Sequence, residues 1–441
     1  MSFSQYPSYK ESGVTWLGDV PDHWHVKRLG YYFSERREKV SDTEFPALSV
    51  TKNGIVPQIE TAAKTDDGDN RKKVCRGDFV INSRSDRKGS SGVSPLDGSV
   101  SLINTVIRTQ ERVNSQFMDY LLRSYPFQEE FYRFGRGIVA DLWSTTYSEM
   151  RNIILSMPDL DEQRLIASFL DGETAKINQL ISEQQRLVEL LKEKRQSVIT
   201  TVVTKGLDRH TRMKRSGIEW LEEIPETWDV VPLKHLARLG GKTFTDGDWI
   251  ESPFIVAEGV RLIQTGNIGI GVFKEQGFRY VSNATFVELH CTQVDPGDVL
   301  ICRLDGPVGR ACLAPDLGGR MITSVDNAIL KVASNVSAGF VVALLSSVTW
   351  LSWIDALCRV GGGFRLRVSR SMLGDLRVPL PPFSEQNAIV AYLTRAIAEW
   401  DALAAEAERA INLLRERRTA LISAAVTGKI DVRGLVNAKA A

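Results

Sequence analysis

One phrase occurs twice in the chain. SGVTWLGDVPDHW occupies residues 12–24, and SGIEWLEEIPETW occupies residues 216–228. The phrase contains neither a nucleophile–base pair nor a metal-ligand spacing, so it does not indicate a catalytic site. An internal repeat constrains the fold instead, because each copy begins an equivalent structural unit. We therefore predict two copies of one domain.

A second repeat lies further along each copy. SMPDLDEQRLIASFL (residues 156–170) matches PLPPFSEQNAIVAYL (residues 379–393), and the similarity continues through residues 192–208 and 415–431. Matching residues are further apart here than in the opening phrase, so the extra residues of the second copy lie in its interior. The two ends of each copy match, whereas the segment between them, its interior, differs in length and sequence. This pattern predicts two recognition domains that read different targets.

Two long helices are predicted to follow the domains. Asp161 and Ser384 each precede an apolar periodic run, as helix N-caps do. Apolar residues then alternate at spacings of four and three over about 45 residues, roughly 65 Å of helix, which is typical of a coiled coil. The alternative is an amphipathic helix that lies on its own domain. We expect the two helices to pack together as an antiparallel coiled coil in a pseudo-twofold arrangement.

Two arginines interrupt the apolar seam of these helices. Arg195 and Arg418 occupy equivalent positions in the two copies. A buried cation needs a partner or a route to solvent. In an antiparallel pairing, acids near the helix ends such as Glu173 or Glu399 are expected to provide that partner.

Composition indicates a soluble protein of two or three domains. A chain of 441 residues is too long for one ordinary core, and its formal net charge is only +1. The five cysteines form no C-x-x-C pair and the histidines complete no zinc pattern, which predicts reduced thiols in a cytoplasmic protein. The N-terminus lacks the apolar stretch of a signal peptide.

One uncharged segment is long enough to suggest a membrane span. It covers Val332–Ile354. Its FVVALLSS matches FMDYLLRS in the first copy, where Asp119 and Arg123 are charged. A membrane span would not have such a counterpart, so both segments are predicted to be buried helices, and no membrane is expected as a partner.

Several apparent catalytic motifs are incomplete. LGGKTF (residues 239–244) has Leu236 where a phosphate-binding loop needs its first glycine. PLPPF (residues 379–383) resembles the catalytic motif of amino-methyltransferases, but Leu380 stands where the residue that binds the target amine should be. FGRG (residues 134–137) lacks the strand–turn–helix context of a methyl-donor site. We predict no catalytic, cofactor-binding or metal-binding residue in this chain.

Cations cluster in two loop-rich stretches. Arg71–Lys88 holds seven basic residues against two acids, and Arg359–Arg370 holds four arginines and no acid. Basic residues in Gly/Ser-rich loops suit phosphate contact, and arginine also reads guanine with two hydrogen bonds. A solvated surface position remains the alternative for any single arginine.

Polar loops in the two interiors supply the candidate DNA contacts. NSRSDRKGSSG (residues 82–92) and CRLDGPVGR (residues 302–310) follow matching Gly-Asp turns, and residues 48–54 and 262–269 form a second pair. Ordinary hairpin turns remain an equal alternative. The predicted DNA-binding residues are Lys52, Asn53, Arg84, Arg87, Lys88, Gln264, Asn267, Arg303, Arg310, Arg365 and Arg367.

The repeated phrase, the P-x-x-[DS]EQ helix start and the duplication of both resemble the specificity subunit of type I restriction–modification enzymes. The resemblance covers nearly the whole chain. It implies an α+β protein of two target recognition domains and two long helices, in which each domain reads one half of a bipartite DNA site. The expected segments are residues 1–158, 159–207, 208–381 and 382–441, with the helices setting the gap between half-sites.

The resemblance also implies partners. Two methylation subunits would bind S-adenosylmethionine and methylate adenine, and restriction subunits would use ATP and Mg²⁺ to cleave double-stranded DNA. Two alternatives remain: an enzyme with its own fused methyltransferase or nuclease, and a helical scaffold that binds only protein. The incomplete methyltransferase motifs count against the first, and salt-dependent DNA binding would exclude the second.

Overall fold

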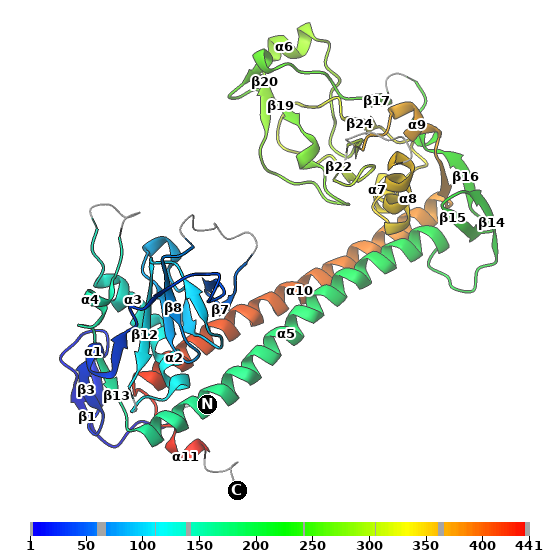
Figure 1. Cartoon of the computed structure of the whole chain (residues 1–441). Coiled ribbons are helices and arrows are strands. Elements are labelled where there is room, and N and C mark those ends of the chain that lie inside the picture. Colours follow the sequence, from blue (N-terminus) through cyan, green and yellow to red (C-terminus); the bar gives the residue numbers. More distant parts are fainter. Residues whose placement is uncertain are drawn as a thin grey trace. The chain divides into compact units, whose positions relative to one another are not determined.

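The computed structural model describes residues 3–59, 68–110, 112–137, 143–240, 243–304, 306–359 and 366–436. The chain divides into two compact units, of which unit 1 comprises Met1–Gln185 and Glu408–Ala441 and unit 2 comprises Arg186–Ala407. Two long helices, α5 (Leu160–Lys205) and α10 (Phe383–Val426), contribute to both units (Figure 1). The predicted α+β class is confirmed.

An antiparallel sheet in the order β10-β9-β12-β4 forms the centre of unit 1. Its strands are β4 (Phe33–Glu35), β9 (Phe79–Asn82), β10 (Ser91–Val93) and β12 (Asn104–Thr109). Beside it lie a three-stranded sheet and a hairpin, formed by β5 (Lys39–Val40), β8 (Arg71–Val74) and β11 (Gly98–Val100), and by β6 (Leu48–Thr51) and β7 (Gly54–Pro57). Helices α2 (Ser115–Arg123) and α3 (Tyr125–Arg133) bury Phe117, Phe127 and Phe131 in the core.

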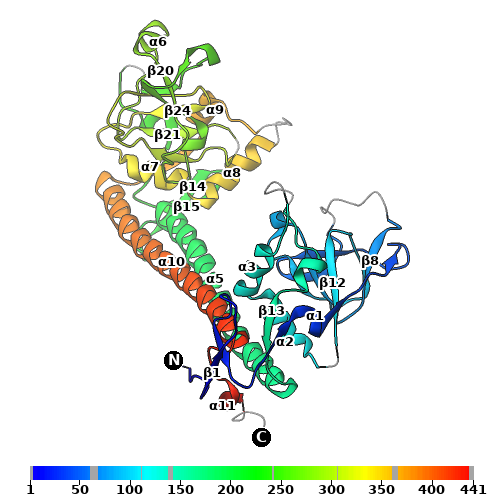
Figure 2. The ribbon, with the colours of Figure 1, turned by 90° about the vertical axis from the view of Figure 1, so that its left-hand side faces the viewer.

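Unit 2 repeats this sheet. The order β22-β21-β24-β17 corresponds strand by strand to β10-β9-β12-β4. The strands are β17 (Phe244–Asp246), β21 (Val299–Cys302), β22 (Ala311–Leu313) and β24 (Asn327–Leu330). Helices α7 (Ala338–Leu345) and α8 (Val348–Arg359) occupy the positions of α2 and α3, between the sheet and the long helices of unit 2 (Figure 2). The sequence repeat is therefore a structural repeat.

A second four-stranded sheet distinguishes unit 2. Its order is β18-β20-β19-β23, with β19 and β23 parallel. The elements are β18 (Ile255–Val256), β19 (Val260–Ile263), β20 (Arg279–Val281), β23 (Met321–Thr323) and the neighbouring helix α6 (Asn283–Glu288). A small apolar cluster around Val260, Leu262 and Ile322 supports this sheet.

Each copy begins and ends in paired strands. The opening phrases lie in or directly after the first strand of two hairpins, which are β1 (Tyr9–Glu11) with β2 (Asp19–Pro21), and β14 (Met213–Ile218) with β15 (Leu221–Pro225). The next strands pair with the last strands of their copies: β3 (His25–Arg28) with β13 (Ile154–Met157), and β16 (Asp229–Pro232) with β25 (Arg377–Leu380). The short helices are α1 (Leu29–Tyr32), α4 (Tyr147–Met150), α9 (Arg370–Asp375) and α11 (Arg433–Val436).

The last tryptophan of each opening phrase explains why the phrase is repeated. Trp24 and Trp228 are fully buried, and a buried indole N–H needs an acceptor. Trp24 donates to Glu162 at 3.2 Å, and Trp228 donates to Glu385 at 3.0 Å. Both acceptors belong to the Glu-Gln pair of the second repeat, in the first turn of a long helix. The two repeated motifs therefore hold each other in place.

The glutamines of the Glu-Gln pairs also have equivalent partners. Gln163 accepts from the backbone N–H of Asn114 at 2.8 Å and donates to the carbonyl of Pro158 at 2.9 Å. Gln386 accepts from Ser337 N–H at 2.7 Å and donates to Pro381 at 2.8 Å. Because Asn114 and Ser337 are the N-caps of α2 and α7, these contacts tie the start of each long helix to its domain.

The predicted N-cap residues of the long helices are wrong. Helix α5 begins one residue before Asp161, and it is Asp159 whose carboxylate accepts from Glu162 N–H at 2.8 Å. Helix α10 begins at Phe383, and the carbonyl of Pro382 accepts from the N–H groups of Glu385 and Gln386. The proline-containing turns therefore start both helices earlier than the spacing suggested.

The long helices lie side by side and run in opposite directions within each unit (Figure 1). In unit 1, Ile177 and Ile181 of α5 share a core with Ile411 and Leu421 of α10. In unit 2, Ile199, Val202 and Val203 of α5 share a core with Ile389 and Leu393 of α10. The predicted antiparallel pairing is confirmed.

The two seam arginines have partners other than the predicted acids. Arg195 pairs with Asp401 at 3.1 Å in unit 2, and Arg418 donates to Asn178 at 2.6 Å in unit 1. Asp401 and Asn178 occupy matching positions of the repeat, so the two contacts are equivalent. Glu173 instead pairs with Lys176 at 2.5 Å.

Within the described ranges no single helix is long and apolar enough to span a membrane, although α7 and α8, bent by 60°, pass that test together.

Candidate nucleic-acid interface

Three turns of unit 1 surround one groove, which we call the hairpin groove. They are the β6–β7 turn, the loop after β9 and the turn before β12, and the groove has a volume of about 610 Å³. Its lining includes Lys52, Asn82, Arg87, Ser101 and Asn104. The structure therefore places the two predicted loops of the first copy next to each other, although about 30 residues separate them.

Local hydrogen bonds shape these loops. The Thr51 hydroxyl donates to the carbonyl of Gly54 at 2.9 Å, which tightens the β6–β7 turn below the exposed Lys52 and Asn53. Asn82 accepts from the backbone N–H of Arg84 at 3.0 Å, at the end of β9. The backbone here therefore forms ordinary turns, as the alternative interpretation expected. The exposed side chains belong to residues of these turns.

The basic residues after β9 differ in their exposure and in their ion-pair partners. Arg84 is exposed, and the Arg87 side chain is 70% exposed with Asp86 3.8 Å away. Lys88 pairs with Glu129 at 2.5 Å and lies 5.3 Å from the centre of the Tyr132 ring. Arg84 and Arg87 are thus better placed than Lys88 to contact a ligand.

A second groove of about 600 Å³ adjoins Lys52 and Asn53 within unit 1. Arg123 contributes a cation to it, pairs with Asp119 at 3.0 Å and donates to the carbonyl of Lys52. Burial, with a hydrogen bond to Asp171, raises the pKa of Tyr120 to about 12, so this phenol stays protonated and donates. Sequence patterns gave no sign of this groove, because it combines α2 with both long helices.

Arg303 and Arg310, predicted as base contacts, are buried and serve the fold. Arg310 is 6% exposed and donates to the carbonyls of Ile268, Leu304, Pro307 and Thr265 at 2.7–3.2 Å. Arg303 is 5% exposed, donates to the carbonyls of Val368 and Val325, and lies 3.0 Å from Asp246. Burial lowers the pKa of Arg303. Their donors are directed into the protein, which corrects the predicted role.

Arg310 should therefore contribute to stability. Replacing it with alanine removes the donor of one buried and three partly buried hydrogen bonds to carbonyls, and we expect a loss of about 3 kcal/mol in the free energy of unfolding. Arg367→Ala is the matched control, because Arg367 is half exposed and pairs with Asp326 at 2.9 Å; we expect it to cost under about 1 kcal/mol. Denaturant unfolding measures both, and equal small losses would contradict the structural role of Arg310.

Asn267, another predicted DNA contact of the second copy, is also buried. Asn267 is 1% exposed; its side chain accepts from Gln264 N–H at 2.8 Å and donates to the carbonyls of Lys274 and Gln276. It organises its own turn, which corrects the prediction of a base contact. Gln264 is half buried in that turn, and Arg365 lies outside the described residues.

A cationic hollow in unit 2 was missed from the sequence. It has a volume of about 760 Å³, and its lining includes Lys234, Arg238, Phe244 and Arg370. Arg370 lies 3.2 Å from Asp246 and 5.8 Å from the Phe244 ring centre. Lys234 and Arg370 are far apart in the sequence, so no local pattern could predict the hollow.

The described ranges contain no cluster of three or more His, Cys, Asp or Glu side chains that could hold a metal ion. All five cysteines are free thiols. Burial raises the pKa of Cys312 to about 12, which disfavours its reactive thiolate.

No family model matches this chain. Two curated relatives from Methanocaldococcus jannaschii are 23% identical to it: a putative type I restriction enzyme MjaX specificity subunit, matched over 96% of this chain and 98% of the relative, and the MjaVIII specificity subunit, over 94% and 95%. The predicted resemblance to type I specificity subunits is therefore confirmed along almost the whole chain.

Solved structures agree with the predicted fold. One, from work on the complex assembly and conformational transition of the type I R-M system, has a TM-score of 0.69 at 18% identity and covers 92% of this chain and 98% of its own. The HsdS subunit from Thermoanaerobacter tengcongensis has a TM-score of 0.55 at 19% identity, covering 93% and 98%. The fold of this chain is thus shared with both structures.

Proposed function

We propose that this chain is the specificity subunit of a type I restriction–modification complex. Each domain reads one half of a bipartite, asymmetric DNA site, and the helix pair sets the gap between the halves. The observation that carries this proposal is the duplicated sheet: two domains of one topology present different loops. A whole-length likeness to specificity subunits supports it.

The proposal assigns the chemistry to partner subunits. Two methylation subunits would bind S-adenosylmethionine and methylate adenine, and restriction subunits would use ATP and Mg²⁺ for cleavage. The chain itself would bind double-stranded DNA in the cytoplasm and hold no catalytic group. Its near-neutral charge fits this division, because the partners would supply much of the phosphate contact.

Sequencing of the host chromosome tests the proposal. Long-read sequencing that detects N6-methyladenine should show a split motif, two short sequences separated by unspecified bases. Deletion of this gene should remove the motif, and its return on a plasmid should restore it. A modification pattern that is indifferent to the deletion would exclude the proposed role.

The purified chain alone should be inactive. We expect no methyl transfer to DNA, no cleavage, and no binding of S-adenosylmethionine above background, because the methyl-donor and target-amine motifs are incomplete. Transfer of labelled methyl groups, with the complex containing the methylation subunits as positive control, measures this. Methyl transfer by the chain alone would favour the fused-enzyme alternative.

Arg84 and Arg87 should read one half-site. If either arginine binds a guanine, its replacement by alanine should cost ~1–3 kcal/mol of binding and relax one position in one half. Arg164→Ala is the control, because Arg164 is an exposed arginine of α5 outside the hairpin groove. Binding of the complex to variant duplexes measures the effect. A loss shared by all sequences would make these residues phosphate contacts.

A further inference from the structure

A second short motif repeats inside the divergent interiors. SLIN (residues 101–104) matches SVDN (residues 324–327), at the same offset as the Glu-Gln pairs. Asn104 begins β12 and Asn327 begins β24, which are equivalent strands. Both asparagines are buried, with 5% and 0% exposure. A four-residue match with two identical residues is too short to be recognised from the sequence alone.

The orientation of the Asn104 amide follows from its partners. The Nδ2 atom donates to the carbonyl of Ser101 at 3.2 Å and to the Ser101 hydroxyl at 3.0 Å. A carbonyl only accepts, so the atom that faces it must be Nδ2. The Oδ1 atom is buried and has no hydrogen-bond partner within the described residues.

The Asn327 amide has the same orientation. Its Nδ2 atom donates to the hydroxyls of Thr323 at 2.8 Å and Ser324 at 3.2 Å. The Thr323 hydroxyl itself donates to the carbonyl of Ile263 at 3.1 Å, so it accepts from Asn327. The Oδ1 atom of Asn327 is likewise buried without a partner in the described ranges.

A buried acceptor without a donor is unfavourable, because it has lost its hydration and gained nothing. Native proteins therefore rarely retain one, and those that they keep are commonly satisfied by water or a ligand. Here two interiors that differ in length and sequence keep the same acceptor, fixed by the same kind of anchor. The same unpaired acceptor in both interiors leaves room for a donor from outside the described residues.

The hairpin groove shows the chemistry of that donor. Asn104 lines the groove together with Lys52 and Arg87, which suit phosphate, and with Ile103, which is 40% exposed and suits an apolar base edge or sugar. In the major groove of DNA, adenine N6 and cytosine N4 are donors, whereas guanine O6 and thymine O4 are acceptors. An isolated acceptor therefore distinguishes amino bases from keto bases.

We propose that Asn104 and Asn327 are specificity-determining residues, each accepting a hydrogen bond from the exocyclic amino group of an adenine or cytosine in its own half-site. The inference rests on the proposed function. It adds a base class at one position in each half, and residues that differ from the exposed cations.

The test uses the full chain expressed with its methylation subunits, and long-read sequencing of the host chromosome. In Asn104→Ala, the preference for an amino base at one position of one half should fall by about tenfold or more. The other half should be unchanged. Asn327→Ala is the matched variant and should affect only that other half.

Three results would overturn the inference: an unchanged motif in Asn104→Ala, as expected if water alone satisfies the amide; a changed position that prefers guanine or thymine; and an equal loss of methylation at all sequences with a lower melting temperature. Should the Ala variant unfold, Asn104→Asp decides, because its oxygens still accept; a retained amino-base preference supports the inference and a lost one overturns it. If the unaltered chain gives no split motif, the proposed function itself fails.

Discussion

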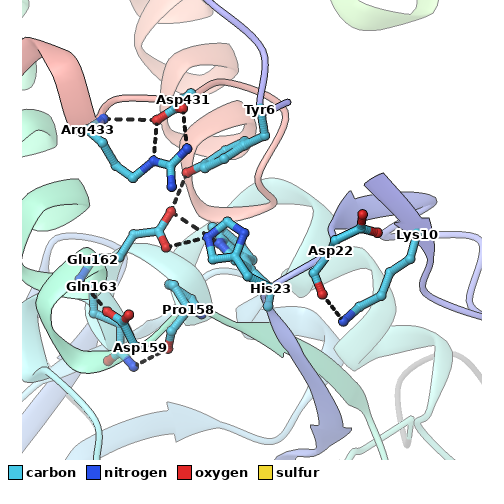
Figure 3. Close-up of polar contacts among 11 residues, drawn as sticks. Tyr6, Lys10, Asp22, His23, Pro158, Asp159, Glu162, Gln163, Asp431 and Arg433 are labelled. Atoms are coloured by element: carbon cyan, nitrogen blue, oxygen red, sulfur yellow. Dashed lines mark hydrogen bonds and ion pairs between the residues drawn. The ribbon is translucent and has the colours of Figure 1, made fainter. Parts of the chain in front are cut away.

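Replacing Glu162 with alanine should destabilise unit 1 by about 3 kcal/mol, because three donors lose one buried acceptor. Glu162 is 5% exposed and accepts from Tyr6 at 2.7 Å, from His23 at 2.7 Å and from Trp24 at 3.2 Å. Figure 3 shows Tyr6 and His23 converging on this carboxylate from the N-terminal segment. Hydrogen bonds to a charged acceptor are stronger than neutral ones, which makes this loss large.

The C-terminal segment completes the same cluster. Arg433 pairs with Asp431 at 2.6 Å and lies 4.9 Å from the Tyr6 ring centre (Figure 3). Asp431 N–H donates to the carbonyl of Ser4 at 2.8 Å. Burial and the bond to Glu162 raise the pKa of Tyr6, so its hydroxyl remains a donor at neutral pH. Glu162 therefore anchors the N-terminal segment of unit 1, and the C-terminal segment is held against that N-terminal segment through Ser4 and Tyr6.

Thermal unfolding of the full chain measures the effect of Glu162→Ala. A loss of about 3 kcal/mol should lower the melting temperature of unit 1 by roughly 10 °C. Glu385→Ala is the matched control, because His210 and Thr227 stand at the positions of Tyr6 and His23 in the second copy. Its loss should be smaller. Equal losses in the two variants would show that the Tyr6 and His23 contacts add nothing to the Trp–Glu bond.

The sequence predicts the repeated elements of the fold well, because they depend on patterns that are local and that occur twice. The opening phrase, the Glu-Gln pair and the apolar seam each recur, and each indicates an element directly. The contact between Trp24 and Glu162 was not predicted, because the sequence shows that both motifs repeat but not that they touch. The same limit explains the seam: Arg195 was placed correctly, but its partner Asp401 depends on the register between two helices.

The candidate site was predicted less well, for a physical reason. An arginine in a Gly-rich loop looks the same in the sequence whether it faces solvent or binds backbone carbonyls. Arg84 is exposed, whereas Arg310 donates to four carbonyls, and the difference lies in the chain that folds around each loop. Asn267 was misassigned for the same reason. Its Gly-Asn turn suggested an exposed amide, but the side chain closes the turn from inside.

Lengthening both long helices should change the gap between half-sites and leave the bases unchanged. The change is four residues inserted between Gln185 and Arg186 of α5, and four between Ala407 and Glu408 of α10. These positions are where each helix passes from one unit to the other, so the contacts within each unit are kept. Four residues add ~6 Å and exceed one helical turn only slightly, so the apolar seam is disturbed little.

DNA rises about 3.4 Å per base pair, so the methylated motif should acquire a gap longer by one or two base pairs. Methylation at the original spacing should disappear, which makes this the largest expected effect on function. Long-read sequencing of the host chromosome reads the motif directly, with the unaltered chain as reference.

Insertion into α5 alone provides the control for register. It shifts one helix against the other by about one turn, so that Arg195–Asp401 and Arg418–Asn178 cannot both form as they do now. We expect it to lower methylation at every spacing, because one helix is then longer than its partner. If the double insertion still modifies the original spacing, the helices do not set the gap. If the double insertion changes the bases that are recognised, the recognition domains depend on the helices for more than the distance between them.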